Sequence, residues 1–173
     1  QPNYEPENDD VFDIDFIGKQ LKWKSIATDT TNSFNDRNLR SSYVYLSYQS
    51  DSEKTVLFEA SGHSLVLING LPHEGDHYDF GWNLIPLKLK KGLNKFVLKV
   101  GRFPRIRARL IDPKTPIQFT TRDVTLPDLL VEENQTYLGA IRIINASKNW
   151  VENHTITSEI NGVSLSHKLS SIP

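Results

Sequence analysis

Hydrophobic and polar residues alternate with a period of two through most of this chain, which is the spacing of a half-buried β-strand. Near the N-terminus, Phe12, Ile14 and Phe16 alternate with aspartates, and Leu21 and Trp23 alternate with lysines. No sustained 3.6-residue pattern occurs, so helix is expected only as a turn or two. The pattern therefore predicts an all-β protein.

Strand-sized apolar segments follow one another closely from residue 42 onward. Asn69-Gly70, and Lys91-Gly92 followed by Asn94, supply the backbone conformations that tight turns need. The stretch 28–40 is rich in Asn, Asp, Thr and Ser and predicts a loop. Strands at this spacing, joined by turns, are typical of a jelly roll or another β-sandwich. The predicted strands are 43–48, 55–60, 65–68, 85–89, 96–100 and 106–111.

The closely spaced strand patterns end near residue 112. Pro113, Pro116 and Pro127 lie along a stretch that we expect to be extended and to link two sheets. Strand patterns resume over 137–145 and 154–160, and an Asn161-Gly162 turn leads into 163–169. About 60 residues are too few for a complete Ig-like sandwich of about 100. We therefore predict a flexible lead over 1–10, a β-sandwich over 11–112, and the start of a second β-domain over 113–173.

Composition and charge narrow the function classes. The 173 residues are 38% hydrophobic and 24% charged, which is typical of a folded domain. A formal net charge of −1 gives no long-range field for nucleic acid or anionic lipid, and no apolar run approaches the roughly 18 residues that a bilayer-spanning helix needs. Because the chain has no Cys, thiol nucleophiles and thiolate metal sites are excluded. We expect neither nucleic-acid binding nor membrane insertion.

The N-terminal lead and the sequons bear on localisation. The chain begins QPNYEPENDD, an acidic, proline-containing stretch that fits a mature N-terminus after signal-peptide removal, or a trimmed fragment. We predict an exported protein that is secreted, periplasmic or at the cell surface. Sequons for N-glycosylation begin at Asn134, Asn145 and Asn153, and whether they carry glycans stays open.

The order of motifs from YVYLSYQS to FVLKVGR resembles a known module. This part of the chain is similar to the galactose-binding-like β-sandwich of bacterial glycoside hydrolases and other exported hydrolases. The likeness rests on a strand ending in Asn69-Gly70, an aromatic loop with Tyr78 and Trp82, the motifs PLKL and KGLN, and a strand over 96–100. The likeness covers roughly 10–112, and the remainder looks like the start of an Ig-like domain. The resemblance implies a non-catalytic accessory module, with carbohydrate as ligand and a downstream catalytic domain in the same chain.

The segment HEGDHYD over 73–79 gathers several ionisable side chains in one loop. His73, Asp76 and His77, with Glu74 and Asp79, offer enough ligand atoms for zinc or calcium, but the spacing matches no metal motif, and Gly75 indicates a turn. A solvated polar loop, a carbohydrate-contacting rim and a metal site are the alternatives. We predict no metal and no other cofactor.

Two aromatic residues and a row of arginines complete the candidate ligand contacts. Tyr78 and Trp82 offer flat faces that stack on sugars, although packing in the core is the alternative. Arg105 and Arg107 share one face of a predicted strand with Arg109. The row could bind an acidic partner, or it could be a solvated face paired with carboxylates of neighbouring strands. The candidate site is His73, Asp76, His77, Tyr78, Trp82, Arg105 and Arg107.

No catalytic residues are predicted. Gly62-His63-Ser64-Leu65-Val66 falls one residue short of the Gly-x-Ser-x-Gly elbow, and a strand follows where the elbow needs a helix. Two function classes remain. The first is an accessory module of an exported hydrolase that binds carbohydrate weakly or acts as a spacer and docking surface. The second is a stand-alone surface or adhesion protein with protein partners.

Overall fold

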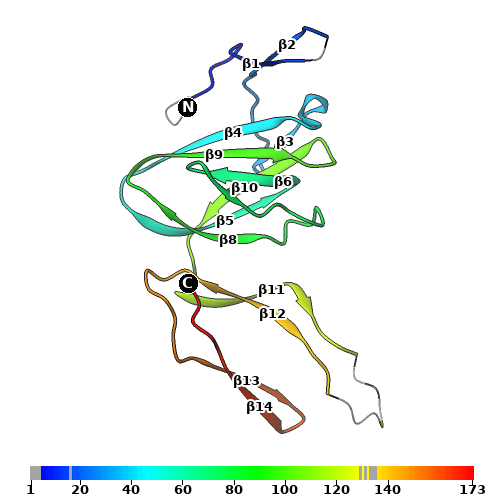
Figure 1. Ribbon diagram of the computed structural model, residues 1–173, viewed down its shortest axis with the longest axis vertical. Coiled ribbons are helices and arrows are strands. Elements are labelled where there is room, and N and C mark those ends of the chain that lie inside the picture. The colour runs from blue at the N-terminus through cyan, green and yellow to red at the C-terminus, as the bar shows by residue number, and fades with distance from the viewer. Residues whose placement is uncertain (1–4, 16, 129, 131, 133–135) are drawn as a thin grey trace. The chain divides into compact units, whose positions relative to one another are not determined.

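The computed structural model describes residues 5–15, 17–128, 130, 132 and 136–173. It is an all-β, sandwich-like fold with several antiparallel sheets, and among the described residues helix is confined to the 3-10 turn η1, Arg37–Leu39 (Figure 1). The all-β, sandwich-like prediction is confirmed at this level. Phe16 of the first predicted strand and the sequon residue Asn134 lie outside the described residues.

Two four-stranded sheets make up most of the fold. One has the order β4-β9-β6-β7, and the other has the order β3-β10-β5-β8. The strands of the first are Tyr43–Ser50, Gly92–Val100, His63–Ile68 and Leu71–His73. The strands of the second are Ser33–Asn35, Arg105–Ile111, Lys54–Ser61 and Leu84–Leu89.

The chain divides into two compact units, which are described separately. The first comprises residues 1–53, 59–83 and 90–109, and the second comprises 54–58, 84–89 and 110–173. The second unit thus includes two segments that come before residue 112 in the sequence. The predicted boundary between 112 and 113 stays a prediction.

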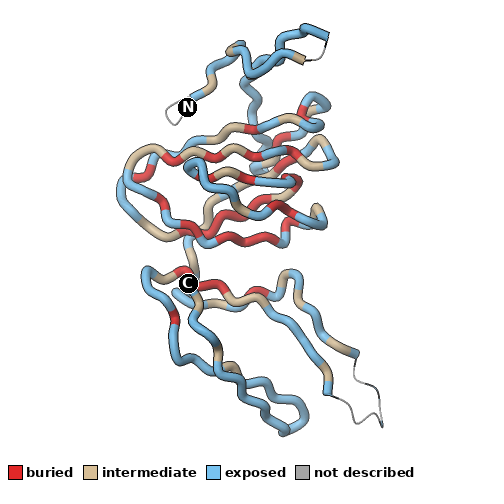
Figure 2. The backbone as a smooth tube through the Cα atoms, in the orientation of Figure 1, coloured by how far each residue is buried: buried red, intermediate tan, exposed pale blue. Residues whose placement is uncertain are grey.

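The core of the first unit follows the alternation seen in the sequence. On β9, Phe96, Leu98 and Val100 are buried, while Lys99 between the last two is exposed. Val66 of the neighbouring strand β6 is also fully buried. Figure 2 shows buried, intermediate and exposed residues along the whole chain. The period of two therefore places apolar side chains on one face of this sheet.

Two predicted turns form as expected. Asn69 and Gly70 both have positive φ, at 51° and 86°, and they join β6 to β7. Asn94 is buried, and its amide accepts from the backbone N–H of Lys90 and donates to the Lys90 carbonyl. Its side chain therefore closes the turn that the sequence marks.

Four elements were missed in the sequence. Strand β3 and η1 lie inside the predicted 28–40 loop, because Phe34 and Leu39 are buried there. Strand β7 takes in His73 at the start of HEGDHYD. Strand β11, Ile117–Thr125, lies between Pro116 and Pro127, where an extended link was expected. Prolines bound this strand without interrupting it, since neither lies within its ladder.

The second unit contains two hairpins. Strand β11 pairs with β12, Ala140–Asn145, and β13, Thr155–Ile160, pairs with β14, Val163–Lys168, through the predicted Asn161-Gly162 turn. A small core of Leu57, Leu84, Ile144 and Ala146, with Ile111 packed against it, lies in this unit. In the first unit, a separate hairpin of β1, Val11–Ile14, and β2, Gln20–Lys22, follows the lead.

Candidate functional site

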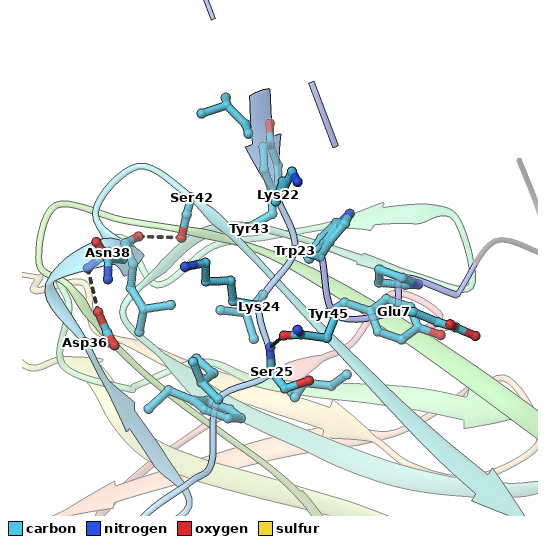
Figure 3. A pocket seen from close by; sticks show the side chains of 18 of the residues that line it. Glu7, Lys22, Trp23, Lys24, Ser25, Asp36, Asn38, Ser42, Tyr43 and Tyr45 are labelled. Atoms are coloured by element: carbon cyan, nitrogen blue, oxygen red, sulfur yellow. Dashed lines mark hydrogen bonds between the residues drawn. The ribbon is translucent and has the colours of Figure 1, made fainter. Parts of the chain in front are cut away.

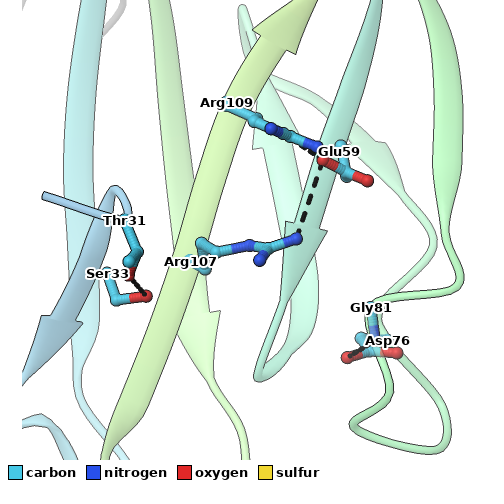
Figure 4. A network of polar contacts seen from close by, with 7 residues as sticks. All are labelled: Thr31, Ser33, Glu59, Asp76, Gly81, Arg107 and Arg109. Atoms are coloured by element: carbon cyan, nitrogen blue, oxygen red, sulfur yellow. Dashed lines mark hydrogen bonds and ion pairs between the residues drawn. The ribbon is translucent and has the colours of Figure 1, made fainter.

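A buried carboxylate holds the loop between β7 and β8. Asp76 is 8% exposed, and its Oδ2 accepts from the backbone N–H of Gly62 at 3.1 Å. The same oxygen accepts from the backbone N–H of Gly81 at 3.0 Å (Figure 4). The Asp76 N–H donates to the His63 carbonyl at 2.8 Å. This predicted ligand contact is therefore engaged by the backbone, and its carboxylate fixes the shape of the loop.

Close backbone approach explains the glycines of this region. A Cβ on Gly75 would lie 2.2 Å from the Ser64 carbonyl oxygen, and one on Gly62, whose φ is +81°, would lie 2.1 Å from that of Arg105. The Asn83 amide also donates to the Gly75 carbonyl. Only glycine fits at these two positions, because the loop lies against the backbone of β6 at Gly75, and the connection from β5 to β6 lies against β10 at Gly62.

Three exposed aromatic side chains gather at the far end of this loop. Tyr78, Phe80 and Trp82 are 61%, 65% and 36% exposed, and we call them the aromatic cluster. The ring centroids of Phe80 and Trp82 are 4.8 Å apart, those of Tyr78 and Trp82 are 5.8 Å apart, and those of Tyr78 and Phe80 are 6.4 Å apart. Trp82 therefore packs against exposed rings and not in the sandwich core.

Phe80 was missed in the sequence as a site residue. The signal was present, because aromatic residues occupy every second position from 78 to 82. That spacing puts side chains on one side of an extended segment. Exposed apolar rings in contact with one another are unusual on a surface and mark it as a candidate binding site.

A hollow of about 390 Å³ opens beside the aromatic cluster, and we call it the loop hollow. Tyr78 lines it together with Arg102 and Phe103, whose guanidinium and ring are in cation-π contact at 5.6 Å. His77 and Asp79 line it as well, so aromatic faces, a cation and a carboxylate surround one opening. Its size lies within the range of small-ligand sites.

Burial alters the protonation of two groups that line the loop hollow. Burial, and next the charge of Asp76, raise the pKa of Asp79 above its usual value, whereas the charge of Arg105 opposes the shift. Burial lowers the pKa of His63, although the Asp76 carboxylate and a contact with the Glu74 backbone counteract it. For both side chains, burial in the protein favours the uncharged form more than water does.

The structure brings together part of the predicted site. Asp76, His77 and Tyr78 line the loop hollow, and Trp82 contacts Tyr78 beside it. His73 lies instead at the end of β7, opposite Val66 in the ladder.

The arginine row divides between two roles. Arg105 is exposed at the start of β10, and its charge acts on Asp79. Arg107 pairs with Glu59 of the adjacent strand β5, with 3.7 Å between Nη2 and Oε2, and Arg109 also binds this buried carboxylate (Figure 4). The geometry of Arg107 and Arg109 matches the alternative of a strand face paired with a neighbouring carboxylate.

The described residues contain no group of three or more His, Cys, Asp or Glu side chains placed to hold a metal ion. They likewise contain no helix that is long and apolar enough to span a membrane.

No protein-family model matches this chain, and neither curated proteins nor solved structures match it significantly. The class that the structure itself defines is an all-β, sandwich-like protein with an exposed aromatic loop.

Proposed function

We propose that this chain is a non-catalytic accessory module of an exported multidomain hydrolase and that it binds carbohydrate weakly. In this proposal, residues 11–112 form a galactose-binding-like jelly roll and 113–173 open an Ig-like domain. The observation that supports it is the aromatic cluster, which stands exposed on a loop anchored by Asp76. Rings held in place by a rigid loop need little ordering when a sugar stacks on them.

The chemistry of the loop suits a neutral sugar. Flat rings pack against the apolar C–H face of a pyranose, and the groups of the loop hollow can bond its hydroxyls. The Asp79 carboxylate accepts, and Arg102 donates, so opposite charges face the ligand without a net attraction for ions. At so open a surface we expect affinity on the order of micromolar to millimolar.

The proposal that the chain is non-catalytic is supported by the setting of Ser64. This residue lies within β6, and its hydroxyl donates to the Lys99 carbonyl at 3.4 Å. A nucleophile elbow needs a strand, a sharp turn and a helix, and a continuous strand does not supply it. The chain then serves a downstream catalytic domain by binding substrate or by acting as a spacer and docking surface.

One observation favours the second candidate, a surface or adhesion protein with protein partners. The register of β13 and β14 puts Ile156, Ile160, Val163 and Leu165 on one face of the hairpin, and the last three are more than half exposed. An apolar hairpin face is suited to contact with another protein.

Affinity electrophoresis in gels that contain neutral polysaccharides tests the first candidate. The wild-type chain should be retarded by at least one of them, and Trp82→Ala should abolish the retardation. Trp150→Ala is the control, because Trp150 is 63% exposed and lies outside the loop. Equal retardation of all three proteins, or no retardation of the wild type, would overturn the proposal of carbohydrate binding at this loop.

A further inference from the structure

A second hollow, of about 790 Å³, lies in the first unit away from the loop hollow (Figure 3). It is lined by lead residues 6–8, by residues 19–26, which include β2, by four residues between 34 and 39 in the region of β3 and η1, and by residues 42–46 around the start of β4. Because Lys19, Lys22 and Lys24 all line it, we call it the lysine hollow.

Aromatic side chains form part of its lining. Trp23, Tyr43 and Tyr45 are among the lining residues. The Phe12 ring fixes the first two, with centroid distances of 5.4 Å to Trp23 and 5.5 Å to Tyr43. The indole N–H of Trp23 is buried and finds no acceptor among the described residues. A buried donor left without an acceptor is unfavourable, and an oxygen of a ligand could satisfy it after a small adjustment of the ring.

Lysines and carboxylates both line the lysine hollow. Its three lysines are exposed, and none has an ion pair within 4.0 Å among the described residues. Glu7 and Asp36 are the carboxylates of the lining, and Asp36 is already engaged as the cap of η1, where it accepts from the Asn38 N–H at 2.7 Å. The hydrogen bond leaves the charge of Asp36 in place, so three lysines and two carboxylates give the lining a formal net charge of +1.

We propose that the lysine hollow binds an anionic polysaccharide, with uronate carboxylates or sulfate groups held by Lys19, Lys22 and Lys24 and a sugar ring packed on the aromatic lining. Ammonium groups attract anions at close range, and flat rings provide apolar contact for the sugar. The net charge of −1 gives no long-range field, so recognition is local to this hollow and not a property of the whole surface. This site is independent of the aromatic cluster.

The test is retention of the full chain on immobilised polygalacturonate and on immobilised dextran sulfate, at low and at physiological salt. The wild type should bind at least one of them, more weakly as salt rises, since exposed charges are screened. Lys22→Gln/Lys24→Gln should weaken binding by about tenfold. The control Lys90→Gln/Lys91→Gln removes the same charge from an exposed connection outside the hollow and should bind like the wild type.

The two columns identify the anion, because retention on polygalacturonate alone indicates carboxylate and retention on dextran sulfate alone indicates sulfate. Failure of the wild type to bind either column would overturn the proposal, as would retention on single-stranded DNA only. Equal weakening in the control variant would also overturn it, because the attraction would then be diffuse. Trp82→Ala should bind the anionic columns like the wild type. The proposal for the lysine hollow and the proposal of neutral-sugar binding at the aromatic cluster can therefore fail separately.

Discussion

Asp76 Oδ2 accepts a hydrogen bond from the backbone N–H of Gly81 at 3.0 Å, and this bond closes the loop that carries the aromatic cluster. The same oxygen also accepts from Gly62, so one carboxylate ties the loop to the end of β5. The loop with the aromatic cluster and the end of β5 are thereby connected through a single buried side chain.

Replacing Asp76 should loosen this loop. Asp76→Ala removes the carboxylate oxygen that accepts from two buried N–H groups, at a cost of about 2–4 kcal/mol in the free energy of unfolding. Asp76→Asn keeps an acceptor oxygen and should cost clearly less. Denaturant titration of both variants measures the difference, and an alanine variant as stable as the asparagine variant would show that the carboxylate does not hold the loop.

His63 should make stability depend on pH. Its pKa is lowered in the folded protein from the usual 6.5, so the unfolded chain binds the proton first as pH falls. Stability is therefore retained above about pH 6.5 and lost as pH falls below it. Thermal melting from pH 8 to pH 5 should show this loss in the wild type and a smaller one in His63→Gln. Parallel curves would contradict the assignment to His63.

Asp79 should act in the opposite sense. Because its pKa is raised in the folded protein, ionisation above the usual value of 3.8 costs stability. Asp79→Asn is therefore expected to stabilise the fold at pH 7, and this gain should disappear near pH 3. Melting temperatures of the two proteins at both pH values measure the effect, and a destabilised variant at pH 7 would mean that the carboxylate makes a favourable contact.

Arg107 and Arg109 should substitute for one another in part. Glu59 is 1% exposed on its side chain, whereas the two arginine side chains are 40% and 47% exposed, so water weakens each pair. A single Arg→Ala change should cost about 1 kcal/mol, but the double change removes both arginine partners of a buried carboxylate and should cost about 3 kcal/mol or more. A double-mutant cycle by urea unfolding measures this. Simple additivity would show that Glu59 does not depend on the pair.

The sequon at Asn145 should remain unmodified in the folded protein. Asn145 is 8% exposed, and its Nδ2, the atom that glycosylation modifies, donates to the Asn149 carbonyl at 2.9 Å. Its Oδ1 accepts from the Ser147 N–H at 2.9 Å. Asn145→Ala should therefore destabilise the second unit by about 1–3 kcal/mol. Mass spectrometry of protein made in a glycosylating host checks the first point, and an occupied Asn145 in the folded protein would contradict it.

Local patterns in the sequence allowed most of the strands to be predicted. The alternation on β9 and the Asn69-Gly70 turn are properties of neighbouring residues, so both could be read directly. Strand β3 could not, because its polar sequence reads as a loop and only burial of Phe34 in the folded chain stabilises it there.

The candidate site shows the same limit. Trp82 could be proposed from its polar loop, but the position of Asp76 against Gly62 depends on a contact between residues 14 apart. The pairing of Arg107 and Arg109 with Glu59 also joins distant segments, since Arg109 and Glu59 are 50 residues apart in the sequence. Such long-range contacts leave no trace in local spacing.

The most direct test of carbohydrate binding at the aromatic cluster is the NMR signal of the Trp82 indole N–H during titration with soluble neutral oligosaccharides. The chain has three tryptophans, so the three indole signals can be assigned with Trp→Phe variants. Saturable movement of the Trp82 signal, with those of Trp23 and Trp150 unchanged, is the predicted result. An unmoved Trp82 signal with every oligosaccharide, or equal movement of all three, would contradict it.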